Sequence, residues 1–228
     1  MECLLLSDMQ TGTIYGVALN YREELDQLGP SMYSEPYRQP PQAPVLYIKP
    51  VNTRSGHLSP IPLPKEEPKL KMGPALAIVI GKTASRIAEE DAYEYIAGYT
   101  VANDVSIPRD SYYRPAIREN ARDGFCPIGH VAVRKEHIRP DHLPIRVYLN
   151  GELLLDSSSE GLVRSIPRLL ADITEFMTLQ EGDIILTGVP PGAPFAEAGD
   201  TVMVEIPGVG ILENTIVKET PAGEAESG

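Results

Sequence analysis

The sequence predicts a mainly β fold with a few short helices, of the α+β kind. The chain of 228 residues contains 22 prolines and 19 glycines, and their spread along the chain favours short strands joined by tight turns over a helical bundle. Short apolar runs recur between these residues, and the clearest helical periodicity is confined to one segment. At 24.9 kDa and 42% hydrophobic residues, the chain can bury a full core. We expect a single domain over residues 1–218.

The first third of the chain alternates short strands with irregular segments. Residues 14–19 and 45–49 are predicted to be strands. Between them, residues 22–28 have helical character and lead into a proline- and tyrosine-rich run over 30–44, which is expected to be irregular. Residues 61–71 begin with alternating prolines and continue with charged side chains, and they are expected to form a surface loop.

Two apolar runs predict strands in the interior of a sheet. Residues 76–80 are one run, and residues 97–102 are apolar on both faces, as is typical of an interior strand. Between them, residues 89–95 begin with acidic side chains. Acidic residues are favoured in the first turn of a helix, so a helix is expected there.

A hairpin is predicted where Asn150-Gly151 joins residues 146–149 to residues 152–155. This dipeptide accepts the two positive φ angles of a type I′ turn.

The best helical pattern begins after Ser165, which can cap the helix, with Pro167 in its first turn. The apolar residues that recur at helical spacing are Ile166, Leu169, Leu170, Ile173, Phe176 and Met177.

Three further strands are expected over residues 182–187, 201–206 and 209–217. An apolar set on these strands, at Ile184, Leu186, Val202 and Val204, is expected to need cover and so predicts pairing between chains. Residues 219–228 are predicted to be a flexible acidic tail, because they carry little that can be buried.

Composition excludes several classes of partner. The formal net charge of −12 argues against nucleic-acid binding, which requires clustered cations. A local group of arginines, Arg109, Arg114, Arg118 and Arg122, still suits a small anionic substrate. No apolar run reaches the length of about 18 residues that a membrane helix needs, and the N-terminus lacks a convincing signal peptide. We therefore expect a cytoplasmic protein.

Several motifs are similar to those of the fumarylacetoacetate hydrolase superfamily. They are a strand ending in Gly81-Lys82, the run Gly-Tyr-Thr-Val-Ala-Asn-Asp at 98–104, Tyr-Ile-Lys-Pro at 47–50, the Asn-Gly-Glu hairpin within 147–152, and Glu-Gly-Asp-Ile-Ile-Leu-Thr-Gly at 181–188. The resemblance covers nearly the whole chain and implies the mixed β-sandwich or roll of that family.

The resemblance also implies a metal site, because in that family two glutamates and an aspartate hold one divalent cation, usually Mg²⁺, with Mn²⁺ or Ca²⁺ as alternatives. When the family motif is aligned with this sequence backwards from Gly81, its two glutamate positions fall on Gly73 and Ala75. Of the three acidic ligands, Asp104 alone remains. One carboxylate predicts weak metal binding or none. Glutamates restored at both positions are expected to lie on one face of a strand. The alternative role for Asp104 is to end a strand by bonding backbone amides.

Within the superfamily, Tyr-Tyr-Arg-Pro at 112–115 and Arg-Asp-Gly-Phe-Cys-Pro-Ile-Gly at 122–129 are similar to the N-terminal half of the bifunctional isomerase/decarboxylase group of 4-hydroxyphenylacetate (homoprotocatechuate) degradation. The resemblance implies a small 2-oxo or hydroxy di- or tricarboxylate substrate and a homodimer, or a heteromer with a metal-bearing paralogue. The alternatives are a non-catalytic partner subunit with a degenerate metal site, and an acylpyruvate-type C–C hydrolase.

By the same resemblance, residues 22–44 correspond to a lid, in which Glu24 and Gln27 replace the general-base dyad of His and Glu. Glu24 can take a proton, or it can be a solvated helix residue. Lys49 is a candidate for binding a substrate carboxylate, or it can form a salt bridge at a strand end.

Arg122 and Arg114 suit bidentate carboxylate binding, or they can form surface ion pairs. Asn120 and Val189 stand where the family has a lysine and a threonine. The departures from the family pattern therefore concentrate at one predicted site.

Overall fold

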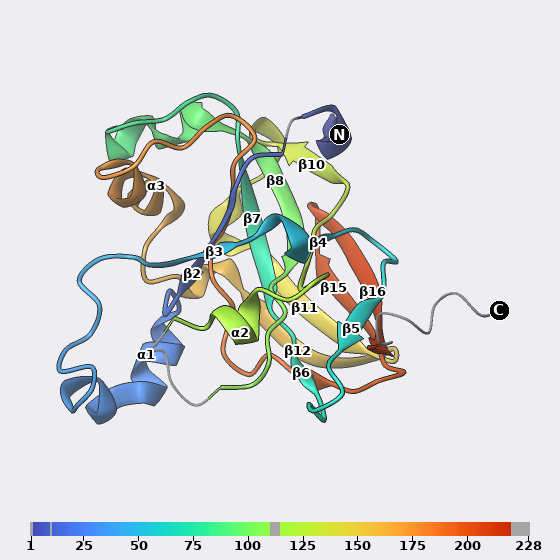
Figure 1. Cartoon of the computed structure of the whole chain (residues 1–228). Coiled ribbons are helices and arrows are strands. Elements are labelled where there is room, and N and C mark those ends of the chain that lie inside the picture. The colour runs from blue at the N-terminus through green and yellow to red at the C-terminus, as the bar shows by residue number, and fades with distance from the viewer. Residues whose placement is uncertain (1, 10, 110–114, 220–228) are drawn as a thin grey trace.

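The computed structural model describes residues 2–9, 11–109 and 115–219, and its largest element is a seven-stranded sheet (Figure 1). The strand order is β1 (Cys3–Leu5), β10 (Val131–Arg134), β8 (Ile96–Asn103), β7 (Pro74–Ile80), β13 (Ile184–Leu186), β2 (Ile14–Ala18) and β3 (Val45–Lys49). Only the β13–β2 pair is parallel among these. The strand β3 forms one edge.

A five-stranded sheet has the order β12 (Glu152–Ser158), β11 (Pro144–Leu149), β15 (Thr201–Ile206), β16 (Gly210–Lys218) and β5 (Ile61–Leu63). Two short pairs join β14 (Phe195–Ala196) to β6 (Leu70–Lys71) and β4 (Arg54–Ser55) to β9 (Cys126–Pro127). The helices are α1 (Arg22–Leu28), α2 (Ile117–Asn120) and α3 (Ile166–Thr174). The described residues thus confirm a mainly β fold with a few short helices.

The main core lies between the two sheets, where β8 contacts β15 and β16, and β7 contacts β11. Alternate residues of β7 point to opposite faces of the sheet, as the pleat requires. Leu76 and Ile78 enter the main core, whereas Ala75 and Ala77 enter a smaller apolar cluster on the other face, together with Cys126. The small side chains of that second face belong to the strands that support the candidate site described below.

The predicted hairpin and the predicted helix cap are both confirmed. Asn150 and Gly151 have φ angles of 52° and 87° between β11 and β12, as a type I′ turn requires. The Ser165 side chain accepts a hydrogen bond from the backbone N–H of Arg168 at the start of α3. The helix ends at Thr174, two residues before Phe176, which is exposed.

One expectation about local structure is wrong. Residues 61–63 form β5 and pair with β16, with Ile61 fully buried, instead of lying in a surface loop. Pro62 is compatible with this strand because β5 is at the edge of its sheet. Proline has no N–H, and on the open side of an edge strand no neighbouring strand requires one. The helix expected over residues 89–95 is confirmed as the 3₁₀-helix η4 (Glu89–Tyr95). Its buried Ala92 packs in the core, and η4 contacts α3.

The apolar set that was expected to need cover from another chain is already covered within this one. Ile184, Leu186, Val202 and Val204 are each at most 1% exposed. Exposed large apolar residues lie instead at the β3 edge and on α2, where Ile48 is 56% and Ile117 67% exposed.

The segment that resembles the family lid begins with α1, followed by the 3₁₀-helix η2 (Gly29–Tyr33). These helices project from one end of the sheets in Figure 1. No helix in the described part of the chain is long and apolar enough to cross a membrane.

Ser165→Ala removes the side-chain cap of α3 and is expected to lower the free energy of unfolding by about 1 kcal/mol. Urea denaturation measures this. Ser157→Ala is the control, because the Ser157 hydroxyl has no partner among the described residues. Equal losses in the two variants would contradict the assigned cap.

Candidate functional site

Tyr47 and Lys49 lie two residues apart on β3, so both side chains point to the same face of the seven-stranded sheet. Gly16 on the neighbouring β2 pairs with Tyr47. A Cβ atom at Gly16 would lie 2.2 Å from the Tyr47 ring. Because Gly16 has no side chain, the Tyr47 ring can lie across β2.

Asp104 follows the last residue of β8, and Gly73 holds it in place beside the start of β7. The Asp104 N–H donates to the Gly73 carbonyl at 2.6 Å, and the Gly73 N–H donates to the Asn103 side chain at 2.7 Å. A Cβ atom at Gly73 would lie 2.0 Å from the carbonyl oxygen of Asp104. This approach of the two backbones is possible only because residue 73 has no side chain.

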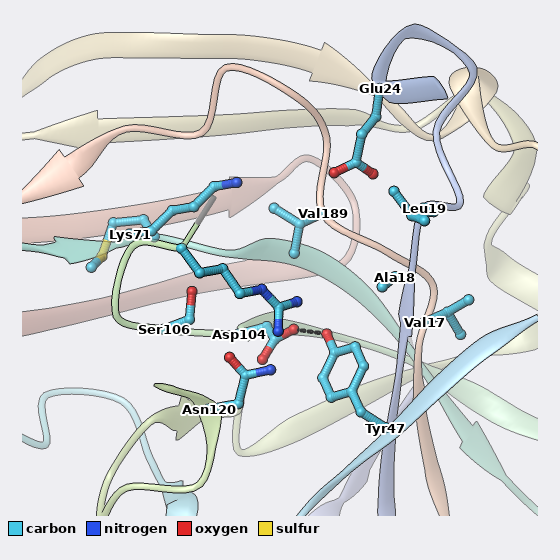
Figure 2. A pocket seen from close by; sticks show the side chains of 12 residues that line it. Val17, Ala18, Leu19, Glu24, Tyr47, Lys71, Asp104, Ser106, Asn120 and Val189 are labelled. Carbon is cyan, nitrogen blue, oxygen red and sulfur yellow. Dashed lines mark hydrogen bonds between the residues drawn. The ribbon is translucent and has the colours of Figure 1, made fainter. Parts of the chain in front are cut away.

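The Asp104 carboxylate meets Lys49 and Tyr47. Lys49 Nζ lies 2.8 Å from Asp104 Oδ1, and both side chains are almost fully buried. The Tyr47 hydroxyl donates a hydrogen bond to Asp104 Oδ2 (Figure 2). Lys49 also donates to the carbonyls of Val105 and Asn120, at 3.1 and 2.9 Å. The ammonium group is therefore surrounded by oxygen atoms of the protein.

Asp104 lies in a pocket that is open to solvent and has a volume of about 60 Å³. Figure 2 shows Glu24 from α1 and Asp104 at opposite ends, with Lys71 extending toward Val189. The lining residues are Val17, Ala18, Leu19, Glu24, Tyr47, Lys71, Met72, Asp104, Ser106, Arg109, Asn120 and Val189.

The pocket unites several residues singled out in the sequence. Glu24, Asn120 and Val189, three predicted departures from the family pattern, line it together with Asp104, the predicted remaining ligand. Lys49 lies beneath it, bonded to Asp104 and Asn120.

Other candidates lie elsewhere. Arg122 is half-buried, donates to the Arg118 carbonyl, and lines a different hollow with Phe125 and Lys218. Gln27 is exposed and bonds Glu23 within α1. Arg114 lies outside the described residues.

Sequence reasoning named no role for Tyr47, Lys71 or Ser106. A signal for Tyr47 was present, since it lies two residues before Lys49 in a predicted strand and so shares its face. For Lys71 and Ser106 no local signal exists. They are brought together by two backbone hydrogen bonds between them, at 2.8 and 3.1 Å.

Burial and charge shift the acidities of two groups near Asp104. The pKa of Tyr47 is raised well above its ordinary value. Burial is the larger cause, and the negative charge of the neighbouring Asp104 carboxylate adds to it. Burial raises the pKa of the Cys126 thiol to about 12, although Lys49 opposes the shift. Both groups therefore stay protonated at neutral pH, and Cys126 is not a nucleophile there.

The family model for the fumarylacetoacetate (FAA) hydrolase C-terminal domain matches residues 13–217. The chain belongs to the FAA hydrolase family. It is 44% identical, over 91% of its length, to the 4-hydroxyphenylacetate degradation bifunctional isomerase/decarboxylase of Escherichia coli. This match covers 48% of that protein, so the chain spans about half the length of the curated relative.

Solved structures of FAA hydrolase relatives share the fold. The 5-carboxymethyl-2-hydroxymuconate delta-isomerase of Mycobacterium smegmatis superimposes with a TM-score of 0.80 and 31% identity, covering 93% of this chain and 81% of that one. The maleylpyruvate hydrolase of Sphingobium sp. SYK-6, in complex with manganese(II) and pyruvate, gives a TM-score of 0.76 and 28% identity, with 91% and 71% covered.

The residues of this chain do not fit the divalent cation of such relatives. Gly73 and Ala75 offer no side-chain oxygen, and no group of three His, Cys, Asp or Glu residues within the described ranges could hold a metal. A cation bound at Asp104 Oδ1 would also stand beside the ammonium of Lys49, and the two positive charges would repel each other in a buried place.

The expected restoration of the two glutamates is also incompatible with this backbone. The strand β7 begins at Pro74, so Gly73 lies before it, and any side chain at residue 73 would collide with Asp104. Ala75 is fully buried in the smaller apolar cluster, where a new carboxylate would have to lose its hydration.

Gly73→Ala is expected to lower the free energy of unfolding by roughly 1–3 kcal/mol, the usual cost of forcing an extra carbon into a packed site. Chemical denaturation checks this. Gly56→Ala is the matched control, since the nearest atom to a Cβ there is 3.9 Å away. A Gly73→Ala variant as stable as the control would contradict the close approach of residues 73 and 104.

Tyr47→Phe removes a hydrogen bond to a buried carboxylate and is expected to cost roughly 1.5–3 kcal/mol at pH 7. A tyrosine whose pKa is raised on folding contributes its full stabilisation at pH values below about 10, its pKa in the unfolded chain. That stability is lost as pH rises toward the folded pKa, at about 1.4 kcal/mol per pH unit.

The variant should therefore lose stability less steeply than the wild type above about pH 10, the unfolded tyrosine pKa. Denaturation at pH 7 and at several alkaline pH values measures both effects. Tyr33→Phe, at a 70% exposed tyrosine, should change neither. Identical alkaline slopes in wild type and Tyr47→Phe would show that the Tyr47 hydroxyl is not held by Asp104.

Proposed function

We propose that the chain is a subunit of an isomerase/decarboxylase of 4-hydroxyphenylacetate degradation. The observation that carries this proposal is the 44% identity over 91% of the chain to bifunctional enzymes of that name. The proposed reaction is decarboxylation of 5-oxopent-3-ene-1,2,5-tricarboxylate or isomerisation of 2-hydroxyhepta-2,4-diene-1,7-dioate. Both substrates are small polycarboxylates, and the pocket places Lys71 and Arg109 in position to attract them.

The chemistry of both reactions suits the residues of the pocket. Each reaction passes through an enol or enolate whose negative charge must be stabilised. Lys71 and Arg109 line the pocket and supply positive charge for substrate carboxylates, while the Asp104 carboxylate at the same pocket is held by Lys49 and Tyr47. Glu24, on the segment that resembles the family lid, is a second carboxylate in the same pocket.

A second candidate function is a non-catalytic subunit paired with a metal-bearing paralogue. Gly73 favours it, because the close contact with Asp104 leaves no room for the metal-binding glutamate of the family. In that assembly the paralogue would supply the metal centre, and this chain would contribute its folded surface.

An apolar groove supports association in either case. It measures about 610 Å³ and lies between β3 and α2. Its lining includes Ile48 and Ile117, both more than half exposed. Exposed apolar grooves beside a sheet edge are typical of sites where another chain packs.

The purified chain is to be assayed for decarboxylation and isomerisation alone, with Mg²⁺, and with the paralogue, while sedimentation follows complex formation. A catalytic subunit predicts turnover that falls at least tenfold in Lys71→Gln, whereas Lys65→Gln, at an exposed lysine outside the pocket, changes nothing. A non-catalytic subunit predicts turnover only in the complex and no effect of Lys71→Gln. A chain that neither turns over substrate nor binds the paralogue would refute both functions.

A further inference from the structure

The apolar groove between β3 and α2 adjoins the pocket. The residues that line both cavities are Ala18, Tyr47, Arg109 and Asn120. They include every polar residue among the described residues that line the groove, since all the others are apolar. The polar groups of the groove are therefore gathered at the end that meets the pocket, and the rest of its wall is apolar.

The groove has the size and the lining of a small-molecule site. Its volume of about 610 Å³ lies within the range of about 300–1,000 Å³ that is typical of ligand sites. Such sites are mostly apolar and contain a few polar groups that fix the orientation of the ligand. Leu46, Ile48 and Ile117 belong to the apolar wall, so a ligand with one polar end and an apolar body matches the groove.

The side-chain amide of Asn120 lacks a hydrogen-bond partner within the described ranges, although the residue is only 7% exposed. Its backbone is fixed, because the N–H donates to the Ala116 carbonyl at 3.0 Å and the carbonyl accepts from Lys49 at 2.9 Å. The amide is not sealed from the cavity, and Figure 2 shows it directed toward Asp104. A buried polar group without a partner is costly. A ligand at the junction of the two cavities can supply that partner.

The polar end of the groove favours an anion. Arg109 lines it, and none of the described lining residues is acidic, although the chain has a net charge of −12. The nearby Asp104 carboxylate is paired with Lys49. Local positive charge in a recess attracts small anions even in an acidic protein. A ligand carboxylate there can accept hydrogen bonds from the Arg109 guanidinium and the Asn120 amide.

We propose that the groove binds a small carboxylic acid that has one charged end and an apolar aryl or alkyl body. The carboxylate lies at the junction, against Arg109 and Asn120, and the apolar body covers Leu46, Ile48 and Ile117. Such an acid and a partner chain on the same groove exclude each other.

This inference goes beyond the proposed function, because the groove ligand belongs to a different chemical class from the proposed substrates. Both of those substrates carry carboxylates at each end. A second carboxylate against the apolar wall would lose its hydration without gaining a partner. Because Arg109 and Asn120 also line the pocket, the groove ligand competes with a ligand of the pocket.

The probes are 4-phenylbutyrate, its uncharged amide 4-phenylbutyramide, and butyrate, which together separate the charge from the apolar body. Each is titrated into the chain alone, with labelled isoleucine methyl groups followed by NMR. We expect 4-phenylbutyrate to shift the signals of Ile48 and Ile117 but not that of Ile211, which is 50% exposed and outside the groove. It should bind at least fivefold tighter than its amide and at least tenfold tighter than butyrate.

Two variants test the two ends of the groove. Ile117→Ser should weaken 4-phenylbutyrate at least threefold, whereas Ile211→Ser, at a matched exposed isoleucine, should not change its affinity. Asn120→Ala should weaken it at least threefold without lowering the urea midpoint, because the amide has no partner to lose within the described ranges. An asparagine with a purely structural role would lower the midpoint and leave the affinity unchanged.

Equal affinities for the acid and its amide, or for the acid and butyrate, would overturn the inference, as would binding that leaves the Ile48 and Ile117 signals in place. Sedimentation at the concentration of the titration identifies the other occupant. A dimer that Ile117→Ser dissociates and that 4-phenylbutyrate leaves intact would show that a second copy fills the groove. No step measures turnover, so a failure of the proposed function leaves this result unaffected.

Discussion

The ion pair between Lys49 and Asp104 holds the candidate site together. Lys49 joins three segments that are distant in sequence: the end of β3, the residues after β8, and α2 through the Asn120 carbonyl. The helix α2 has only four residues and cannot be stable by itself. Removing one partner of such a buried pair typically costs about 3–5 kcal/mol, because the other charge is left unpaired. The geometry of the pocket therefore depends on this contact.

Two glycines make this arrangement possible. Gly73 allows the backbone of Asp104 to approach within hydrogen-bonding distance, and Gly16 leaves space for the Tyr47 ring. Tyr47 then satisfies one oxygen of Asp104 and Lys49 neutralises its charge. These contacts engage both oxygens of the Asp104 carboxylate from within the chain.

The sequence predicted those features that depend on neighbouring residues. The Asn150-Gly151 turn and the Ser165 cap follow from local conformational preferences, and Lys49 and Asp104 were found because each lies in a motif. The β5 strand was missed because the preference of Pro62 for irregular structure was given more weight than the edge position it occupies.

The site residues that were missed depend on contacts between distant segments. Lys71 and Ser106 meet through backbone pairing, and Lys49 bonds a carbonyl 71 residues away. No periodicity in the sequence encodes such distances. Tyr47 was not predicted as a site residue because its bond to Asp104 joins residues 57 positions apart.

The position of the apolar groove links the two proposed properties of this chain. Tyr47, Arg109 and Asn120 line both the groove and the pocket, so a partner chain that packs on β3 and α2 contacts residues that also surround the ligand. Any change in their arrangement on association alters the affinity for the ligand, and by linkage the ligand alters the affinity for the partner by the same factor. Lys49 also bonds the Asn120 carbonyl, so the buried ion pair holds a residue that lines both surfaces.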